Sequence, residues 1–173
     1  MKTLMKLFLM FAVILGGLNM AHAQNSKKEK QAANTAAIKK MMIVHNYVFK
    51  ADYAYPLRGG QKILNYDYDL RVSKDSIIAF LPYYGVAHLA PNPGETEGGI
   101  KFTSTNFIYE VKQNKNGTWD IFIKPKDNNI TDWRDVQQLR LSISPKGYAN
   151  LQVISSNRDP ISFSGYIAEK NKM

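Results

Sequence analysis

Residues 107–124 read FIYEVKQNKNGTWDIFIK, and this stretch decides the fold. Apolar residues alternate with polar ones on both sides of Asn116-Gly117, which is the period of a strand with one buried face. Asparagine and glycine both tolerate the positive φ angles that a tight hairpin turn requires. The stretch therefore predicts two antiparallel strands that are joined at Asn116-Gly117.

The same alternation recurs along the chain, and its repeats are separated by turn residues. It covers residues 43–51, 64–72, 139–143, 149–153 and 161–167, and a shorter apolar run covers 77–81. No helical pattern lies between these segments, which excludes parallel βαβ units. We predict a mainly β domain with a short N-terminal helix: an antiparallel meander of about eight or nine strands, closed as a lipocalin-like barrel or folded as a sandwich.

The N-terminus has the layout of a secretory signal peptide. Lys2 and Lys6 precede an apolar run over residues 7–15, and Ala21-His22-Ala23 supplies the small residues that signal peptidase requires. The run is shorter than the roughly 20 residues that cross a membrane, so we predict cleavage after Ala23 rather than an anchor. No cysteine follows for lipid attachment, and no later segment is apolar enough to span a membrane. We expect a periplasmic or secreted protein that is not a lipoprotein.

Three segments follow from these patterns. Residues 1–23 form the signal peptide, residues 24–42 form a helix or spacer, and residues 43–173 form a single β domain. The middle segment is rich in Lys, Gln and Ala, and its Ser26 and Glu29 have the spacing of a helix capping box.

The composition excludes several classes of function. Without the two signal lysines, 21 basic residues face 14 acidic ones, and this excess of +7 is spread along the chain. A nucleic-acid site would concentrate basic residues on one face, so we expect no such partner. Cysteine is absent, His45 and His88 are far apart in sequence, and residues 127–132 lack the glycine of a calcium loop. We therefore expect no metal and no cofactor.

The long irregular stretch over residues 83–99 is the best candidate for a ligand site, together with the turn at residues 56–60. Tyrosines gather there, and a tyrosine offers a flat apolar body with a polar tip. The candidate ligand-binding residues are Tyr53, Tyr55, Arg58, Tyr83, Tyr84 and His88. The ligand would be a small molecule, a glycan or an envelope protein. The alternative is that these tyrosines cover the ends of the core, while Tyr66, Tyr68, Tyr109 and Trp119 fill it.

Two further classes of function stay open, although the pattern favours binding over catalysis. A hydrolase acting on envelope glycan or peptide would use His88 or the acids Glu95 and Glu97, but no Gly-x-Ser-x-Gly motif is present. Asp67 and Asp69 share a strand face, which is a weak signal for a catalytic carboxylate pair. An assembly domain would instead use an exposed strand edge.

Several phrases of the chain resemble one known family. They are AFLPYYGVA at 79–87, IKPKD at 123–127, LQV at 151–153, SSNR at 155–158 and PISFSGYI at 160–167. These phrases are similar to the DUF4251 family of secreted or periplasmic Bacteroidetes proteins, a family of unknown function. The resemblance implies an exported, mostly β domain, and it implies no catalytic residues.

Overall fold

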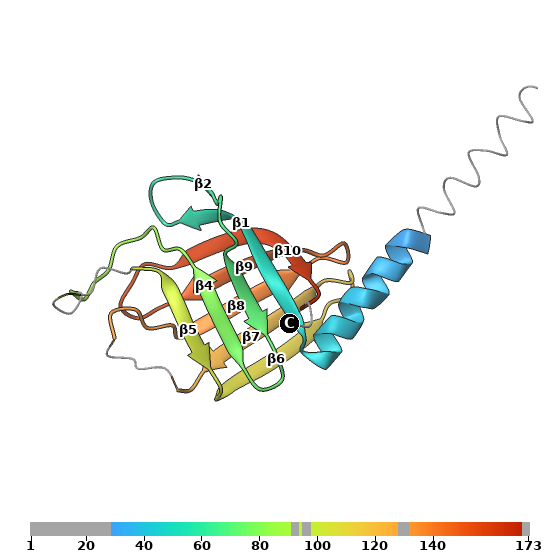
Figure 1. Cartoon of the computed structure of the whole chain (residues 1–173). Helices are drawn as coiled ribbons and strands as arrows, with labels where there is room; N and C mark the ends of the chain where they lie inside the picture. Colours follow the sequence, from blue (N-terminus) through green and yellow to red (C-terminus); the bar gives the residue numbers. More distant parts are fainter. Residues whose placement is uncertain (1–28, 91–93, 95–97, 128–131, 171–173) are drawn as a thin grey trace, which may run out of the picture.

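The computed structural model describes residues 29–90, 94, 98–127 and 132–170 (Figure 1). The predicted cleavage site at Ala23 lies outside these residues, as do residues 24–28 of the predicted helix or spacer. Among the described residues, no helix is both long enough and apolar enough to cross a membrane.

Ten antiparallel strands form one strongly curved sheet, which closes almost completely into a barrel (Figure 1). Their order in the sheet is β5-β4-β3-β1-β10-β9-β8-β7-β6, and β2 pairs with β1 outside this path. The strands β5 and β6 at the two ends of the path are not paired with each other. The strands are β1 (Tyr47–Pro56), β2 (Lys62–Ile63), β3 (Asp69–Val72), β4 (Ile77–Leu81), β5 (Ile100–Ser104), β6 (Phe107–Gln113), β7 (Trp119–Pro125), β8 (Gln138–Ile143), β9 (Tyr148–Ile154) and β10 (Ile161–Ala168).

The predicted fold class is confirmed, and so is the hairpin at Asn116-Gly117. Gly117 has a φ of 80°, and the Asn116 side chain accepts a hydrogen bond from the backbone N–H of Thr118. The strands β6 and β7 pair in register on either side of this turn. Alternate residues of the strands point inward, and they form one continuous apolar core that includes Phe49, Leu70, Leu141 and Phe163.

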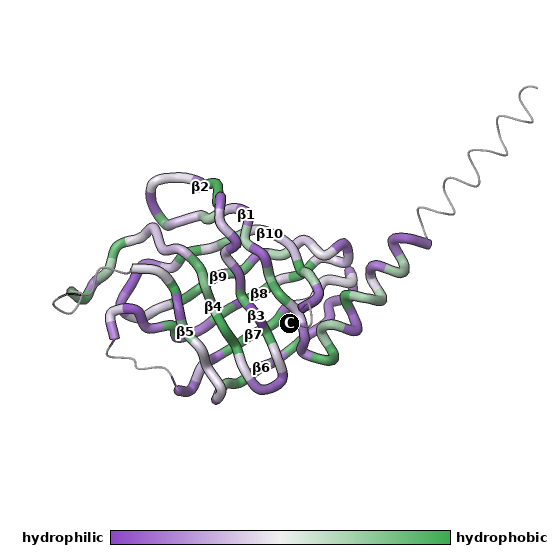
Figure 2. Tube along the Cα trace, in the orientation of Figure 1, coloured by the Kyte–Doolittle hydropathy of each residue, from purple (hydrophilic) through white to green (hydrophobic). Residues whose placement is uncertain are grey.

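The N-terminal helix covers residues 29–44, and it contacts the barrel from Asn34 to its C-terminal end (Figures 1 and 2). Ile38 and Met42 are the helix residues buried in the core. The strand pattern that begins at Ile43 in the sequence starts only at Tyr47 in the structure, because the helix continues to residue 44. His45, with a φ of 51°, then turns the chain into β1.

A β-bulge interrupts β1 where it pairs with β10. The register shifts between Ala51 and Tyr53, so Asp52 and Tyr53 are both exposed on the outer face. Gly165 lies opposite Ala51, and a Cβ atom on it would lie 1.8 Å from the carbonyl oxygen of Lys50. The bulge therefore depends on a residue without a side chain at position 165.

The predicted strand over residues 64–72 is the main difference from the sequence pattern. Only β3 is formed there; the short β2 ends just before this stretch, and the chain between β2 and β3 bends over the bulge of β1. The backbone N–H of Leu64 donates to Asp52, and the backbone N–H of Ala51 donates to Tyr68, both at 2.9 Å. The expectation that Tyr66 fills the core is wrong, because this bend leaves Tyr66 exposed.

Candidate functional site

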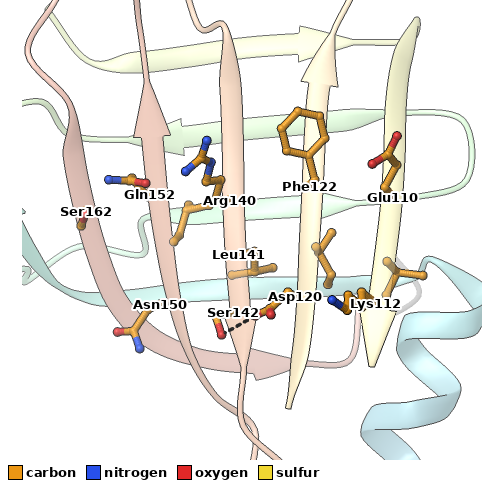
Figure 3. A pocket seen from close by; sticks show the side chains of 13 residues that line it. Glu110, Lys112, Asp120, Phe122, Arg140, Leu141, Ser142, Asn150, Gln152 and Ser162 are labelled. Atoms are coloured by element: carbon orange, nitrogen blue, oxygen red, sulfur yellow. Dashed lines mark hydrogen bonds between the residues drawn. The ribbon is translucent and has the colours of Figure 1, made fainter. Parts of the chain in front are cut away.

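A groove crosses the outer face of the sheet from β6 to β10, and its volume is about 570 Å³. Two rows of outward-pointing side chains form its walls, and each row runs across the strands at directly paired positions (Figure 3). One wall consists of Glu110, Phe122, Arg140, Gln152 and Ser162. The other wall consists of Lys112, Asp120, Ser142 and Asn150.

The floor of the groove is the row of residues between the two walls: Val111, Ile121, Leu141 and Leu151. Three of them are buried because their side chains point into the core, so their backbone forms much of the floor. The N–H and C=O groups of a paired strand are already hydrogen-bonded to its neighbours. A ligand in the groove must therefore be recognised by the side chains of the walls.

Charge is balanced along the walls, with the acids Glu110 and Asp120 and the bases Lys112 and Arg140. Asp120 accepts hydrogen bonds from Asn114 at 2.6 Å and from Ser142 at 2.9 Å, and the latter bond is drawn in Figure 3. These two bonds hold the pKa of Asp120 below its ordinary value. The groove thus presents a carboxylate held in place at Asp120 and has no net formal charge.

Phe122 is the single aromatic side chain of the walls. Figure 3 shows its ring beside Glu110, on the face of the sheet that is turned to the viewer. The ring is only partly buried, so it offers a flat apolar surface among polar neighbours.

Two of the predicted site residues, Tyr53 and Tyr55, lie at the β10 end of the groove. Tyr55 is paired with Ser162 of the groove wall, and Tyr53 is paired with Ser164. Both tyrosine side chains are exposed, and the hydroxyl of Tyr55 lies 3.2 Å from that of Ser164. They extend the polar and aromatic surface of the groove onto β1.

The other predicted site residues, Arg58, Tyr83, Tyr84 and His88, do not line the groove. Arg58 and Tyr84 are exposed, Arg58 in the turn that follows β1 and Tyr84 in the segment that follows β4. Nε2 of His88 lies 3.2 Å from Oδ1 of Asp159. Within the described part of the chain, the His88 side chain forms no hydrogen bond with a serine or threonine hydroxyl. Glu95 and Glu97, the acids of the hydrolase alternative, lie outside the described residues.

Tyr83 belongs to a buried cluster at one end of the barrel, which we call the end cluster: Tyr83, Trp133, Asp135 and Arg158. The Arg158 guanidinium lies 4.6 Å from the Tyr83 ring and 5.7 Å from the Trp133 ring. It donates to the carbonyl oxygens of Gly98 at 2.9 Å and Arg134 at 2.7 Å. Only 2% of Arg158 is exposed. The end cluster therefore ties three loops together.

Asp135 joins the end cluster to the loop that precedes β10. Its carboxylate accepts hydrogen bonds from the Ser155 hydroxyl, the Gln137 side chain and the backbone N–H groups of Ser156 and Asn157. Burial by itself raises the pKa of Asp135, but these four donors outweigh it and lower the pKa below its ordinary value. The ionised form of Asp135 therefore stabilises the folded protein.

Replacing Asp135 with asparagine is expected to lower the free energy of unfolding at neutral pH by about 2 kcal/mol, because an amide nitrogen cannot accept hydrogen bonds. In the unchanged protein, this stabilisation is complete above the unfolded-state pKa of about 3.9 and is lost as the pH falls through the lower folded-state pKa. Urea unfolding at a series of pH values should therefore show a shallower acid loss for Asp135→Asn. An identical pH profile for both proteins would contradict this role.

Sequence reasoning missed both the groove and the end cluster. The strand period places Phe122 and Arg140 on an outward face, but it gives neither the register of β8 against β7 nor the curvature of the sheet. For the end cluster, a signal was present in the phrase SSNR at 155–158. Among the described residues, no group of three or more His, Cys, Asp or Glu side chains could hold a metal ion.

Comparison with known proteins gives a family and no activity. The profile of DUF4251, described as a domain of unknown function, matches residues 29–167. The crystal structure of a DUF4251 family protein from Bacteroides eggerthii is similar, with a TM-score of 0.58 and 15% sequence identity over 80% of this chain and 91% of that chain. No curated protein matches the sequence. The family profile covers most of the chain, and this protein therefore belongs to the DUF4251 family.

Proposed function

We propose that the groove across β6–β10 binds a neutral oligosaccharide and that the protein is a non-enzymatic binding domain of the cell envelope. The observation that carries the proposal is the pair of parallel walls, which present hydrogen-bonding side chains along both sides of the groove and one partly exposed aromatic ring, that of Phe122. The signal peptide predicted over residues 1–23 would bring the domain to the periplasm or the outside of the cell.

The shape of the groove supports an elongated ligand. Five adjacent strands, each about 4.8 Å from the next, give it a length of about 19 Å. A peptide on this floor would find no free backbone groups with which to form a strand pair, because the groove crosses the strands instead of following an edge. Recognition by wall side chains alone suits a chain of sugar units better.

The chemistry of the walls also supports a saccharide. Sugar hydroxyls both donate and accept hydrogen bonds, and the walls combine the acceptor Glu110, the planar donor Arg140 and the amides of Asn150 and Gln152, which do both. The balanced charge of the groove gives no preference for an anion such as nucleic acid or acidic lipid. Phe122 and, beyond the groove, Tyr53 and Tyr55 would contact the apolar faces of sugar rings.

The contributions of Arg58, Tyr83, Tyr84 and His88 to a ligand site stay predictions. Tyr83 has a stacking partner in Arg158, so loss of its ring would also remove an interaction within the fold. The edge of β6 supports the assembly alternative less well, because the strand carries Glu110 and Lys112, and charged residues discourage edge-to-edge pairing.

Isothermal titration calorimetry against neutral malto-, cello-, xylo- and manno-oligosaccharides tests the proposal. We expect one of these series to bind, with an affinity that rises with chain length up to the length of the groove. Phe122→Ala and Arg140→Ala should each weaken binding about tenfold, which corresponds to the loss of one ring contact or one charged hydrogen bond.

Matched controls lie on the same outer face, two residues along their strands from the wall residues Glu110 and Phe122. Ile108 and Lys124 are directly paired on β6 and β7, and neither lines the groove. Ile108→Ala and Lys124→Ala should leave the affinity unchanged. The proposal fails if the control variants weaken binding as much as Phe122→Ala and Arg140→Ala, or if no neutral oligosaccharide binds.

A further inference from the structure

A second depression lies beside the bulge of β1, and we call it the hollow. Its volume is about 420 Å³, and its lining includes Lys50, Asp52, Tyr66, Asp67 and Tyr166. It shares no lining residue with the groove. The hollow is therefore a separate site, and its chemistry can be considered independently of the proposed function.

Two departures from regular sheet structure meet at the hollow. The bulge turns Asp52 outward beside Tyr53, and the bend over residues 64–68 brings Tyr66 and Asp67 over β1. Bulges commonly re-aim a side chain near a binding site, and they are retained despite the disruption of the strand pairing. Here the disruption places carboxylates and tyrosine rings around one space.

The hollow and its immediate surroundings carry an excess of negative charge. Nζ of Lys50 lies 3.5 Å from Asp67 and 3.5 Å from Asp69, and Nε of Arg71 lies 3.0 Å from Asp69. These two cations are thus paired with two carboxylates, and Asp52 adds one more negative charge, so the formal charge is −1 in a chain whose total is +9. Asp52 is the third carboxylate, and the described residues give it no ion pair.

Asp69 adds a buried negative charge on the same side of the sheet. Only 2% of it is exposed, and its Oδ1 atom has no hydrogen-bond partner among the described residues. It lies directly opposite Lys50, which lines the hollow. The charge of Lys50 is thus divided between Asp69 and Asp67, so Lys50 does not cancel the negative charge of Asp52.

Tyrosine rings complete the hollow. Tyr66 is 76% exposed and Tyr166 is 44% exposed, so both rings are open to a ligand. The centroid of the Tyr68 ring lies 6.1 Å from that of Tyr66, and Tyr68 stacks on Phe80. Ring faces of tyrosine attract cations, and the attraction is favoured where a carboxylate is close.

We propose that the hollow is a binding site for an organic ammonium group, with Asp52 and Asp67 facing its charge and Tyr66 and Tyr166 its apolar surface. The local negative charge would repel an anion, and a neutral ligand would leave that charge without a partner. The group could belong to an amino sugar or to a quaternary amine, and both sources share the chemistry that the hollow recognises.

Three small probes distinguish the sources: choline, glucosamine at mildly acidic pH, and glucose as the neutral counterpart of glucosamine. Binding to the purified protein is followed by NMR shifts of the backbone amides of residues 50–53 and 64–68. We expect both ammonium probes to shift these signals and glucose to leave them in place. A response to only one ammonium probe identifies the source. An equal response to glucose, or no response to either ammonium probe, overturns the proposal.

Three variants test the assigned contacts. Asp52→Asn removes one negative charge from an exposed side chain and should weaken ammonium binding about three- to fivefold. Tyr66→Leu should weaken it by a similar factor, whereas Tyr66→Phe should retain it because the ring face is kept. Asp75→Asn, in the turn between β3 and β4, is the matched control and should have no effect. Equal loss with Tyr66→Phe and Tyr66→Leu would contradict the role of the ring.

Discussion

Gly165→Ala is expected to lower the free energy of unfolding by more than about 3 kcal/mol, at the upper end of what a small-to-large change causes. The added Cβ would lie 1.8 Å from the carbonyl oxygen of Lys50 and 2.9 Å from its carbonyl carbon. Both atoms belong to the backbone of β1, so a side-chain rotation cannot relieve the clash. The pairing of β1 with β10 must open, and urea unfolding followed by tryptophan fluorescence would measure the loss.

The matched control for this substitution is Gly98→Ala. A Cβ on Gly98 would meet only the Trp133 ring, at 3.8 Å, which is an ordinary contact distance. We expect the stability of this variant to stay within about 0.5 kcal/mol of the unchanged protein. If Gly165→Ala were as stable as Gly98→Ala, the close approach of β1 and β10 at the bulge would be wrong.

Arg158→Met is the second substitution with a large expected effect, a loss of about 3–5 kcal/mol, which is typical when one partner of a buried charged network is removed. Methionine keeps an unbranched apolar stem but has no donors, so the carbonyl oxygens of Gly98 and Arg134 each lose a hydrogen bond. The rings of Tyr83 and Trp133 also lose the cation that lies beside them. Thermal and urea unfolding would both show the change.

Two further variants separate the causes of this loss. Arg158→Lys keeps the charge but not the planar fork that reaches two carbonyl oxygens, so its stability should lie between those of Arg158→Met and the unchanged protein. Arg140→Met changes the same residue type on the exposed wall of the groove and should alter stability by less than about 0.5 kcal/mol. Similar losses for Arg158→Met and Arg140→Met would exclude a special role of the end cluster.

The sequence was sufficient for features that depend on local chemistry. The Asn116-Gly117 turn and the alternation around it needed only neighbouring residues, and both are present as predicted. The stretch at 64–72 has the same alternation, yet its first half bends away because Asp52 and Ala51 of β1 bind its backbone. Such a contact between distant segments leaves no trace in the local pattern.

The candidate site residues also show that a local sequence pattern does not reveal contacts between distant segments. Alternation identifies Phe122 as an outward residue, but only the register of β7, β8 and β9 aligns Phe122, Arg140 and Gln152 into one wall. Arg158 is the opposite case, because an arginine in a turn is expected to be exposed, whereas this one is buried between two rings. Its burial follows from the convergence of three loops that are distant in sequence.

The pairing of β1 with β10 has a consequence for the order in which the chain folds. The first long strand pairs with the last one, so this pair cannot form until synthesis has released residue 168. The hairpins of β3–β5 and the meander of β6–β9 contain only local pairings and can form earlier, whereas joining the two parts of the sheet through β1 and β10 carries the entropic cost of the longest loop. A chain interrupted before β10 would leave β1 and β9 with unpaired edges that are open to aggregation, so the last eight-residue strand decides whether the two parts of the sheet join.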